Sequence, residues 1–440
     1  LSHQTEKTRE LVLWFFLPVL FSLLFVRLIY FQITEADFSF DKIDNRISQS
    51  KVIKSSRGKI VDRNDRILAE DIIFYDIGID LNYFSYKPGE IKFISNLLNI
   101  EEQNLRERSS NQRLKFIQIS KKVNREKVEA LKKEKIQGLV FDQKYYRNYP
   151  EGEAFSQLIG ITDINNDGLQ GIELSFQKSL DSSDGRKDLK RDGNGKVIEE
   201  VIIPEKDGDL IKLSIDSDYQ FIVFDELKRA VIENNASNAS AIMIDLDTEE
   251  ILAITNYPSF NPNDRKSLSD ISLVTNKASI SLLEPGSVLK PLSISLALDD
   301  ELINEDTLID TNPGWVEFED YRTEDFRNYG ILSVSEVIAK SSNVGTVKIC
   351  SQMNKSRVIS GIRSFGIGEY FSEMFLNHRE GFLPGEQNIS LRGLVSLCYG
   401  YGLQTTLLHI AKAYTGILNE GIEANLKTVS YTHLRAHETS

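Results

Sequence analysis

The sequence predicts a multidomain chain with an N-terminal transmembrane helix, then an α+β domain, then an α/β domain whose sheet is incomplete. Three observations support this fold class. An apolar run occupies 11–33; residues 34–205 mix short strand-like and helical patterns with many polar residues; and from residue 206 helical patterns surround only two clear strands. The length of 440 residues is enough for two or three domains.

Composition places the chain among globular proteins and excludes several kinds of site. Apolar residues make up 41% and charged residues 27% of the sequence. The formal net charge of −13 argues against a nucleic-acid partner, because phosphate contacts need a basic surface. The five histidines lack metal-ligand spacing, so we expect no metal site and no cofactor. Cys350 and Cys398 lie in apolar runs without a pairing pattern, and we expect small buried residues rather than a disulfide or ligands.

The predicted transmembrane helix covers 11–33 and reads LVLWFFLPVLFSLLFVRLIYFQI. A helix of this length extends roughly 34 Å, enough to cross a bilayer core of about 30 Å. No small-residue cleavage site follows, so an uncleaved anchor is favoured over a signal peptide. Lys7 and Arg9 predict that residues 1–10 are a cytoplasmic tail and that the rest lies outside. The alternative, a buried core helix, is disfavoured by the length of the run.

Residues 34–205 carry the signals of the α+β domain. The segment 56–69 alternates apolar and charged residues around Asn64-Asp65, which predicts a β-hairpin with a tight turn. The charged stretch 122–135 is expected to be a solvated helix. Residues 181–209 are rich in Asp, Lys and Gly, which suits a hairpin or linker at a domain boundary.

Residues 206–428 form the predicted α/β domain. A helical pattern covers 219–233, and two strands, 239–246 and 250–255, flank a tight turn. A two-stranded hairpin cannot cover the many helices alone, so we expect further strands from beyond residue 428. Residues 429–440 resemble a translated sequencing adapter, and we expect them to be an artefact, with the natural protein continuing past Thr428.

The first candidate for chemistry is the segment 284–291, which reads EPGSVLKP. A hydroxyl nucleophile, Ser287, precedes an amine, Lys290, by about one helical turn, so the amine could take the hydroxyl proton. Pro285-Gly286 would end the preceding segment and place Ser287 near a helix N-terminus, where backbone N–H groups favour a developing negative charge. By itself an S-x-x-K pattern is weak, because Ser is also a common helix N-cap.

The second candidate is the segment 339–345, which reads AKSSNVG. Ser341 offers a hydroxyl that can relay a proton, and Asn343 offers an amide that can hold a peptide carbonyl or orient an amine. Alone, these residues would suit a polar turn at a helix end. However, S-x-x-K followed about fifty residues later by S-x-N is the ordered signature of β-lactamases and penicillin-binding proteins, in which K-T-G is the third part.

Other segments extend this similarity along the chain. They are Arg57-Gly58 with Asp62-Arg63, and 168–173, 257–263 and 399–403 with Thr406. With them the chain resembles the class B penicillin-binding proteins, most closely the septal peptidoglycan D,D-transpeptidases of cell division, from the anchor to residue 428. The resemblance implies a pedestal (dimerisation-type) domain at 34–205 and a serine transpeptidase (penicillin-binding) domain at 206–428.

Four departures from the family are visible. Asp65 and Glu249 stand where the family usually has a turn Gly, and Leu407 and His409 replace a Pro and a Gln. They put local turns in doubt and leave the chemistry unaffected.

The resemblance implies a mechanism for these residues. Ser287 would attack the carbonyl of the penultimate D-Ala of a stem pentapeptide, expel the last D-Ala and form an acyl-enzyme. Lys290 would act as base when neutral, with Lys340 a possible neighbouring cation that lowers its pKa. Ser341 would pass the proton to the leaving amine, and Asn343 would hold the donor peptide. An amine of a neighbouring stem would then take the acyl group, and β-lactams would trap Ser287.

The resemblance also implies partners and a location. We expect peptidoglycan stem peptides, β-lactams, the membrane, a septal glycosyltransferase and other division proteins as partners. The expected location is the bacterial inner membrane at the division site, with the bulk of the chain in the periplasm. Two alternatives stay open: an elongation-specific class B transpeptidase, and a non-catalytic scaffold of the division machinery.

The third motif is the main departure from the family. Lys427-Thr428-Val429 lacks the Gly of K-T-G and comes too early, so we interpret it as a coincidence. Without K-T-G we expect this chain to be inactive.

Overall fold

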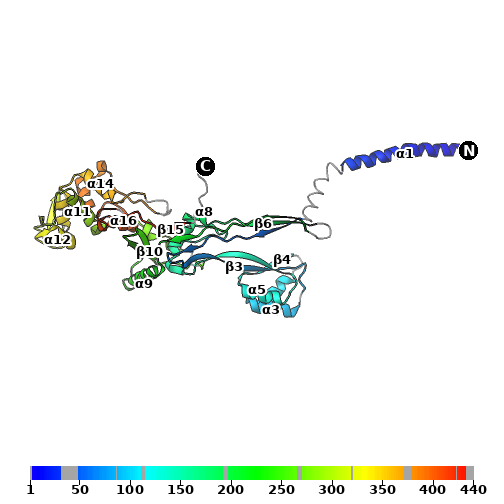
Figure 1. The fold of residues 1–440 in the computed structure, drawn as a ribbon, viewed down its shortest axis with the longest axis horizontal. Helices are drawn as coiled ribbons and strands as arrows, with labels where there is room; N and C mark the ends of the chain where they lie inside the picture. Colours follow the sequence, from blue (N-terminus) through cyan, green and yellow to red (C-terminus); the bar gives the residue numbers. More distant parts are fainter. Residues whose placement is uncertain are drawn as a thin grey trace. The chain divides into compact units, whose positions relative to one another are not determined.

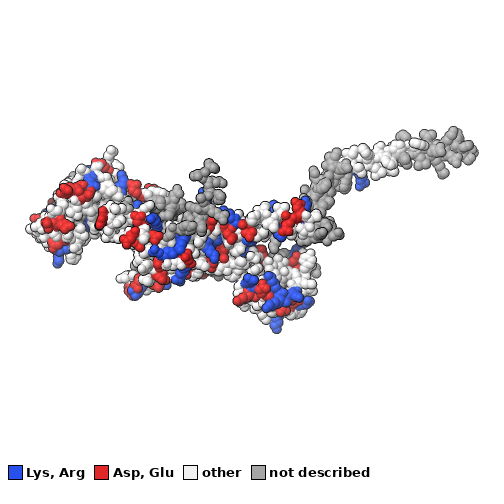
Figure 2. Space-filling view, in the orientation of Figure 1, with Lys and Arg blue, Asp and Glu red and all other residues white. Residues whose placement is uncertain are grey.

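The computed structural model describes residues 2–30, 48–85, 87–110, 114–191, 197–264, 270–318, 321–370, 378–422 and 424–432 (Figure 1). The chain divides into two compact units. The first comprises residues 1–55 and 182–207, and the second comprises residues 56–181 and 208–440. On the face seen in Figure 2, Lys and Arg side chains are interspersed with Asp and Glu, so this face shows no continuous basic surface.

The first unit contains a helix and a three-stranded sheet. The helix α1 spans Ser2–Tyr30, and the strands β1 (Ser48–Ile53), β6 (Gly185–Arg191) and β7 (Val197–Ile203) are antiparallel in the order β1-β6-β7. The hairpin predicted within 181–209 is confirmed. Residues 31–33 of the predicted anchor lie outside the described residues. Within the described part of the chain no helix is long and apolar enough to cross a membrane, so the anchor stays a prediction.

The larger sheet of the second unit has six strands. Its order is β15-β8-β2-β3-β4, and β5 pairs with β3 as well. The strands are β2 (Ile60–Val61), β3 (Ile67–Asp80), β4 (Phe116–Val123), β5 (Leu139–Asn148), β8 (Ile211–Leu213) and β15 (Val429–Thr432). Of the expected artefact at 429–440, the first four residues therefore form β15 beside β8, and 433–440 lie outside the described residues.

The predicted hairpin around Asn64-Asp65 is the β2–β3 turn. Asp65 has a φ of 66°, in the left-handed region that favours Gly. The Asp62 carboxylate accepts hydrogen bonds from the backbone N–H of Asn64 (2.7 Å) and Arg66 (2.8 Å), which hold the turn in this conformation. The same conformation recurs at Glu249, with a φ of 60°. The turns are therefore retained although both positions lack the Gly that is usual in the family.

Helices cover part of the six-stranded sheet. The helices α3 (Pro88–Leu98), α4 (Glu102–Ser109) and α5 (Arg125–Lys133) pack on β3 and β4 (Figure 1). The predicted helix within 122–135 is confirmed, and it begins after Asn124, whose side chain accepts a hydrogen bond from Lys127 N (3.1 Å). This core contains Ile77, Ile79, Ile91, Ile94, Ile117, Val128 and Leu131.

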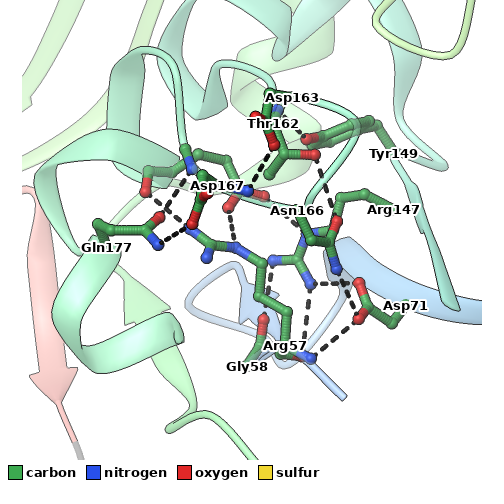
Figure 3. A network of polar contacts seen from close by, with 12 residues as sticks. Arg57, Gly58, Asp71, Arg147, Tyr149, Thr162, Asp163, Asn166, Asp167 and Gln177 are labelled. Atoms are coloured by element: carbon green, nitrogen blue, oxygen red, sulfur yellow. Dashed lines mark hydrogen bonds and ion pairs between the residues drawn. The ribbon is translucent and has the colours of Figure 1, made fainter. Parts of the chain in front are cut away.

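Four short helical segments follow β5: η2 (Gly152–Ala154), α6 (Ser156–Ile159), α7 (Gly171–Ser175) and α8 (Gln177–Leu180). Next to α7 and α8 lies a buried network of charges that includes Arg57, Asp71 and Arg147 (Figure 3). The Glu173 carboxylate accepts from Arg57 Nε (2.7 Å) and from Arg147 Nε (2.7 Å). Arg147 also lies 3.2 Å from an Asp71 carboxylate oxygen, and donates to Gly58 O (2.8 Å).

This network joins two segments that the resemblance had marked, 57–63 and 168–173. The three side chains of the two ion pairs on Glu173 are at most 2% exposed. Burial by itself would lower the pKa of Arg147, but the Glu173 and Asp71 carboxylates outweigh it and keep that pKa above its ordinary value. The network therefore ties the segment before β2 to β3, β5 and α7 through buried ion pairs.

The predicted two-stranded hairpin is β9 (Ala239–Asp245) with β10 (Glu250–Tyr257), and the helix before it is α9 (Ser217–Glu233). Within the described residues this sheet has two strands, as expected. The remaining helical elements are η4 (Ile271–Leu273), α10 (Lys277–Ile280), η5 (Gly286–Leu289), α11 (Lys290–Asp299), α12 (Val334–Ala339), α13 (Asn343–Cys350), α14 (Lys355–Ser364), η6 (Glu386–Asn388), α15 (Leu391–Cys398) and α16 (Leu407–Leu418). The short strands are β11 (Leu308–Asp310), β12 (Trp315–Phe318), β13 (Tyr321–Glu324) and β14 (Ile331–Ser333).

One apolar core crosses the predicted domain boundary at 205/206. It contains Ile60 and Phe155 from before the boundary, and Ile254 and Leu408 from after it. The reason is that β8, the first strand after the boundary, pairs with β2. A second core lies among α11, α13, α14 and α15, and contains Leu292, Ile294, Ile349, Ile362 and Leu397.

A disulfide bond joins Cys350 and Cys398 across this second core. The two Cα atoms are 6.4 Å apart, within the usual range. The expected burial of both residues is confirmed, but the expectation that they are unpaired is wrong. The cysteines are 48 residues apart, and only the packing of α13 against α15 brings the two helix ends together.

Removing this bond is expected to lower the free energy of unfolding by roughly 2–4 kcal/mol, because the bridge closes a long loop in the unfolded chain. The test is urea unfolding of the wild type and of the double variant Cys350→Ala/Cys398→Ala, each with and without reductant. The wild type should lose stability on reduction, whereas the variant should not respond. Equal unfolding midpoints for oxidised wild type and variant would contradict the role of the bond.

Candidate active site

The turn that carries Ser287 begins the candidate site. The short 3₁₀ helix η5 leads directly into α11, so Ser287 precedes a helix N-terminus as predicted. A 3₁₀ helix has three residues per turn, which places Ser287 and Lys290 on the same side. Ser287 is exposed, whereas Lys290 is only 1% exposed.

The Lys290 ammonium connects this turn to the second motif. Its Nζ donates to Ser341 O (2.6 Å), Ser341 Oγ (3.0 Å) and Asn343 Oδ1 (2.8 Å). These bonds go to the second motif and none of them reaches Ser287. The structure therefore brings Lys290, Ser341 and Asn343 into direct contact. Ser287 lies one 3₁₀ turn before Lys290.

Burial lowers the pKa of Lys290 to about 8, and the Asp325 carboxylate opposes this shift. Lys340, which the sequence left open as a neighbouring cation, is not among the causes of this shift. Lys340 is exposed, and its Nζ donates to Glu336 Oε1 (2.9 Å) on its own helix. Desolvation is therefore what favours the neutral amine.

The neutral amine would have a defined direction in this network. It has two N–H groups and one lone pair, and the Ser341 and Asn343 carbonyl oxygens can only accept hydrogen bonds. These two oxygens therefore take the two N–H groups. The lone pair remains available to a hydroxyl, either that of Ser341 or that of Ser287, which is the arrangement a general base needs.

Asp325 supports the second motif, and sequence reasoning missed it. Its carboxylate accepts from Ser342 Oγ (2.6 Å) and from Val344 N (3.0 Å). Asn343 Nδ2 donates to the neighbouring Glu324 O (2.9 Å), which orients the amide so that its oxygen faces Lys290. No sequence signal marked Asp325, because its role depends on β13 packing beside the start of α13.

The segment 399–406 supports the Ser287 turn. Gly286 N donates to Gly400 O (3.0 Å), and Gly402 N donates to Glu284 Oε1 (3.0 Å). Gly400 has a φ of 89°, and a Cβ at this position would overlap the Gly286 backbone. The Gly at this position therefore permits close approach of the two backbones.

Lys427 lies next to β10. Its backbone N donates to Glu249 O (2.9 Å), its O accepts from Ile251 N (2.9 Å) and Ser214 Oγ (3.0 Å), and its ammonium lies 3.7 Å from the Glu249 carboxylate. None of these partners belongs to the Ser287 turn or to the second motif.

His409 is buried, and both of its ring nitrogens contact other residues. Its Nδ1 lies 2.7 Å from Thr406 Oγ1, and its Nε2 lies 3.0 Å from Glu369 O. Because a carbonyl only accepts, Nε2 must carry the proton. Burial lowers the pKa of His409. Across the described residues, no group of three or more His, Cys, Asp or Glu side chains is placed to hold a metal ion.

Comparisons with known proteins agree with this arrangement. Residues 52–213 match the Penicillin-binding Protein dimerisation domain, and residues 239–439 match the Penicillin binding protein transpeptidase domain. The peptidoglycan D,D-transpeptidase FtsI of Buchnera aphidicola subsp. Schizaphis graminum is 32% identical over 93% of this chain and 73% of its own length. The protein of the same name from Escherichia coli K12 is 31% identical over 90% of this chain and 68% of its own length.

Two solved structures share the fold. Penicillin binding protein 2X of Streptococcus thermophilus aligns with a TM-score of 0.71 at 22% identity, over 87% of this chain and 61% of the other. Penicillin binding protein 3 of Mycobacterium tuberculosis, complexed with aztreonam, aligns with a TM-score of 0.64 at 23% identity, over 87% of this chain and 68% of the other. The dimerisation-type domain followed by a transpeptidase-type domain is thus the fold of this chain.

Proposed function

The chain belongs to the family of penicillin-binding peptidoglycan D,D-transpeptidases, and on this premise we propose that it cross-links stem peptides through an acyl-enzyme on Ser287. The observation that carries the proposal is the contact of buried Lys290 with Ser341 and Asn343, one turn from an exposed serine. The similar proteins of Buchnera and Escherichia coli are named peptidoglycan D,D-transpeptidases, which supports the substrate class.

In the proposed first half-reaction, Ser287 Oγ attacks the carbonyl carbon of the penultimate D-Ala. Its proton passes to the neutral Lys290 amine, directly or through the Ser341 hydroxyl. The N-terminus of α11 lies beside the carbonyl oxygen as negative charge develops on it. The C–N bond then breaks, the terminal D-Ala amine takes the proton back from Ser341 and Lys290, and an ester on Ser287 remains.

In the proposed second half-reaction, an amine from a neighbouring stem attacks the ester. The amine proton passes to Lys290 and returns to Ser287 Oγ as the ester bond breaks, which restores the free serine and leaves a new amide cross-link. Asn343 donates from Nδ2 to Glu324 O and accepts from Lys290, so it keeps the Lys290 amine in position through both steps. No cofactor takes part in either half-reaction.

A β-lactam would acylate the same serine, because its strained amide places a carbonyl where the D-Ala–D-Ala amide would lie. The test is to incubate protein expressed from the complete gene with a fluorescent penicillin and to identify the modified peptide by mass spectrometry. We expect one adduct, on Ser287, that unlabelled ampicillin prevents. An adduct on another residue, or no adduct, would overturn the proposal.

The 440 residues contain no K-T-G. We therefore propose that the chain by itself is not acylated. In enzymes with the three-motif signature, the strand that carries K-T-G forms one wall of the substrate groove. The 440-residue chain should fail to bind fluorescent penicillin covalently under conditions in which the product of the complete gene reacts. Labelling of both would contradict this point.

We propose that the chain is anchored in the inner membrane by residues 11–33, with a cytoplasmic N-terminus and its bulk in the periplasm. The buried disulfide supports an oxidising compartment, because such bonds rarely persist in the cytosol. The test is a reporter fused after residue 55. Alkaline phosphatase, which is active only in the periplasm, should be active in this fusion. Unmodified GFP, which fluoresces only in the cytoplasm, should stay dark in the same position, and its fluorescence would contradict the proposal.

The proposed site of action is the division septum, with a septal glycosyltransferase and other division proteins as partners, because the similar transpeptidases carry the name FtsI. A fluorescent fusion should gather at mid-cell. Signal along the side wall would instead favour an elongation-specific enzyme. Growth supported by Ser287→Ala in place of the wild type would favour a non-catalytic scaffold.

A further inference from the structure

The backbone of the Ser287 turn is held at three consecutive residues. Gly286 N donates to Gly400 O (3.0 Å), and Ser287 O accepts from Lys290 N within the turn itself. Val288 O accepts from the Tyr414 hydroxyl, 2.7 Å away, from a helix 126 residues later in the chain. Two of the three bonds therefore come from outside the turn, one on each side of the serine.

The side chains of the turn add little apolar packing at the same place. Ser287 is exposed, and Val288 is 46% exposed. Leu289 is buried and anchors only the end of the turn. The direction of the backbone at Val288 therefore depends chiefly on main-chain hydrogen bonds.

Tyr414 is well suited to fix the Val288–Leu289 peptide group, which contains the Val288 carbonyl. It lies on α16, which is held by buried neighbours in the same helix, including Leu408, Ala413 and Thr415. Burial raises the pKa of the Tyr414 hydroxyl, so it remains protonated and able to donate at physiological pH. The carbonyl oxygen of Val288 can only accept, so the donor in this bond is unambiguous.

We propose that Tyr414 is a positioning residue of the acylation step: by holding the Val288 carbonyl, it sets the direction of Ser287 Oγ relative to Lys290. This proposal rests on the function proposed for Ser287. Without the bond, the Val288–Leu289 peptide group, the second after the serine, is less restrained, and the Ser287 hydroxyl spends less time aligned with the base. Misplacement of a reacting atom by a fraction of an ångström lowers the rate of reaction without removing any reacting group.

The test is Tyr414→Phe in protein expressed from the complete gene, which removes the hydroxyl and keeps the ring. Rapid-mixing measurements with a fluorescent penicillin separate the acylation rate constant from the dissociation constant of the non-covalent complex. We expect the rate constant to fall about three- to tenfold, the range that loss of one neutral hydrogen bond produces. The dissociation constant, the fraction finally acylated and the pH midpoint of acylation should be unchanged, because the Tyr414 hydroxyl binds the Val288 backbone and not Lys290.

Tyr219→Phe is the matched control, since Tyr219 is a 45% exposed tyrosine on α9, away from the turn. Gly400→Ala tests the other support. Its added Cβ overlaps the Gly286 backbone, so the rate constant should fall by more than in Tyr414→Phe. Tyr414→Phe and Gly400→Ala should both be acylated slowly but completely.

The outcomes separate this proposal from the one on which it rests. If the wild type is acylated on Ser287 and Tyr414→Phe reacts at the wild-type rate, the positioning role is overturned and the proposed function stands. If Tyr414→Phe lowers only the fraction of reactive protein or its melting temperature, Tyr414 is merely structural and the proposal again fails. If the wild type forms no adduct on Ser287, both proposals fail together.

Discussion

Replacing Lys290 with Met is expected to slow acylation of Ser287 by about 10²–10⁴-fold, the usual contribution of a general base. Methionine is similar in length, apolar and unable to accept a proton, so it fills the buried site without new charge. The Ser341 and Asn343 oxygens lose the donor that Lys290 supplies. Ser341 is exposed and Asn343 is half-buried, so water can reach both oxygens. The measurement is the second-order rate constant of acylation by a fluorescent penicillin, made on protein expressed from the complete gene.

The pH profile identifies the group responsible. In the wild type the rate should rise with pH through about 8, the lowered pKa of Lys290, because only the neutral amine accepts the Ser287 proton. The Lys290→Met profile should lack this rise. Lys340→Met is the matched control, since Lys340 is exposed and paired with Glu336, and it should react like the wild type. Ser287→Ala lacks the proposed nucleophile and gives the background signal of the assay. A Lys340→Met variant as slow as Lys290→Met would contradict the assignment.

The same pKa shift predicts a dependence of stability on pH. The pKa of Lys290 is about 8 in the folded chain and 10.5 in the unfolded chain, so unfolding takes up a proton between these values. The cost of burying Lys290 is fully present below about pH 8 and declines as pH rises toward 10.5, so this residue makes the folded state more stable with rising pH in that window. Lys290→Met should lack this contribution, which urea unfolding across the window measures.

Replacing Glu173 with Ala is expected to lower the free energy of unfolding by about 3–5 kcal/mol, the largest stability effect we predict. Glu173 is fully buried and bridges Arg57 and Arg147, with a 2.7 Å contact to each. Its loss leaves two buried guanidinium groups, of which only Arg147 keeps a second carboxylate, that of Asp71. Glu173→Gln should cost nearly as much, since an amide places N–H groups against a guanidinium.

The measurement is thermal and urea unfolding of the full chain followed by circular dichroism. Glu151→Gln provides the control. Glu151 pairs with Arg66, whose side chain is 46% exposed, so its replacement should cost less than about 1 kcal/mol. If Glu173→Gln and Glu151→Gln have equal effects, the buried network does not stabilise the fold as described.

Local patterns in the sequence were sufficient for much of the fold. The turn at Asn64-Asp65, the hairpin of β9 and β10, and the helix over 219–233 were predicted correctly from alternation and helical periodicity. Such signals act over a few residues, so they survive without knowledge of the rest of the chain. The limits of α5 were off by a few residues, because Lys122 still belongs to β4.

In the candidate site, too, the sequence predicts some features and the packing of helices decides others. Motif order and spacing identified Ser287, Lys290, Ser341 and Asn343 before any contact was known, and the position of Ser287 before a helix followed from Pro285-Gly286. The contact between Lys290 and the second motif spans more than fifty residues, and it depends on how α11 packs against α13. The sequence left the direction of Lys340 open for the same reason: sequence adjacency does not give the direction of a side chain.

The sequence alone therefore determined the family signature, the local turns and helices, and the candidates for the reactive side chains, because each depends on residue type and short spacing. The tertiary structure decided the Cys350–Cys398 bond, the support of Ser342 by Asp325, and the hold of Tyr414 on the Ser287 turn. These contacts join residues that are 17 to 126 positions apart. Each arises from the packing of whole helices and strands, which a pattern of neighbouring residues does not encode.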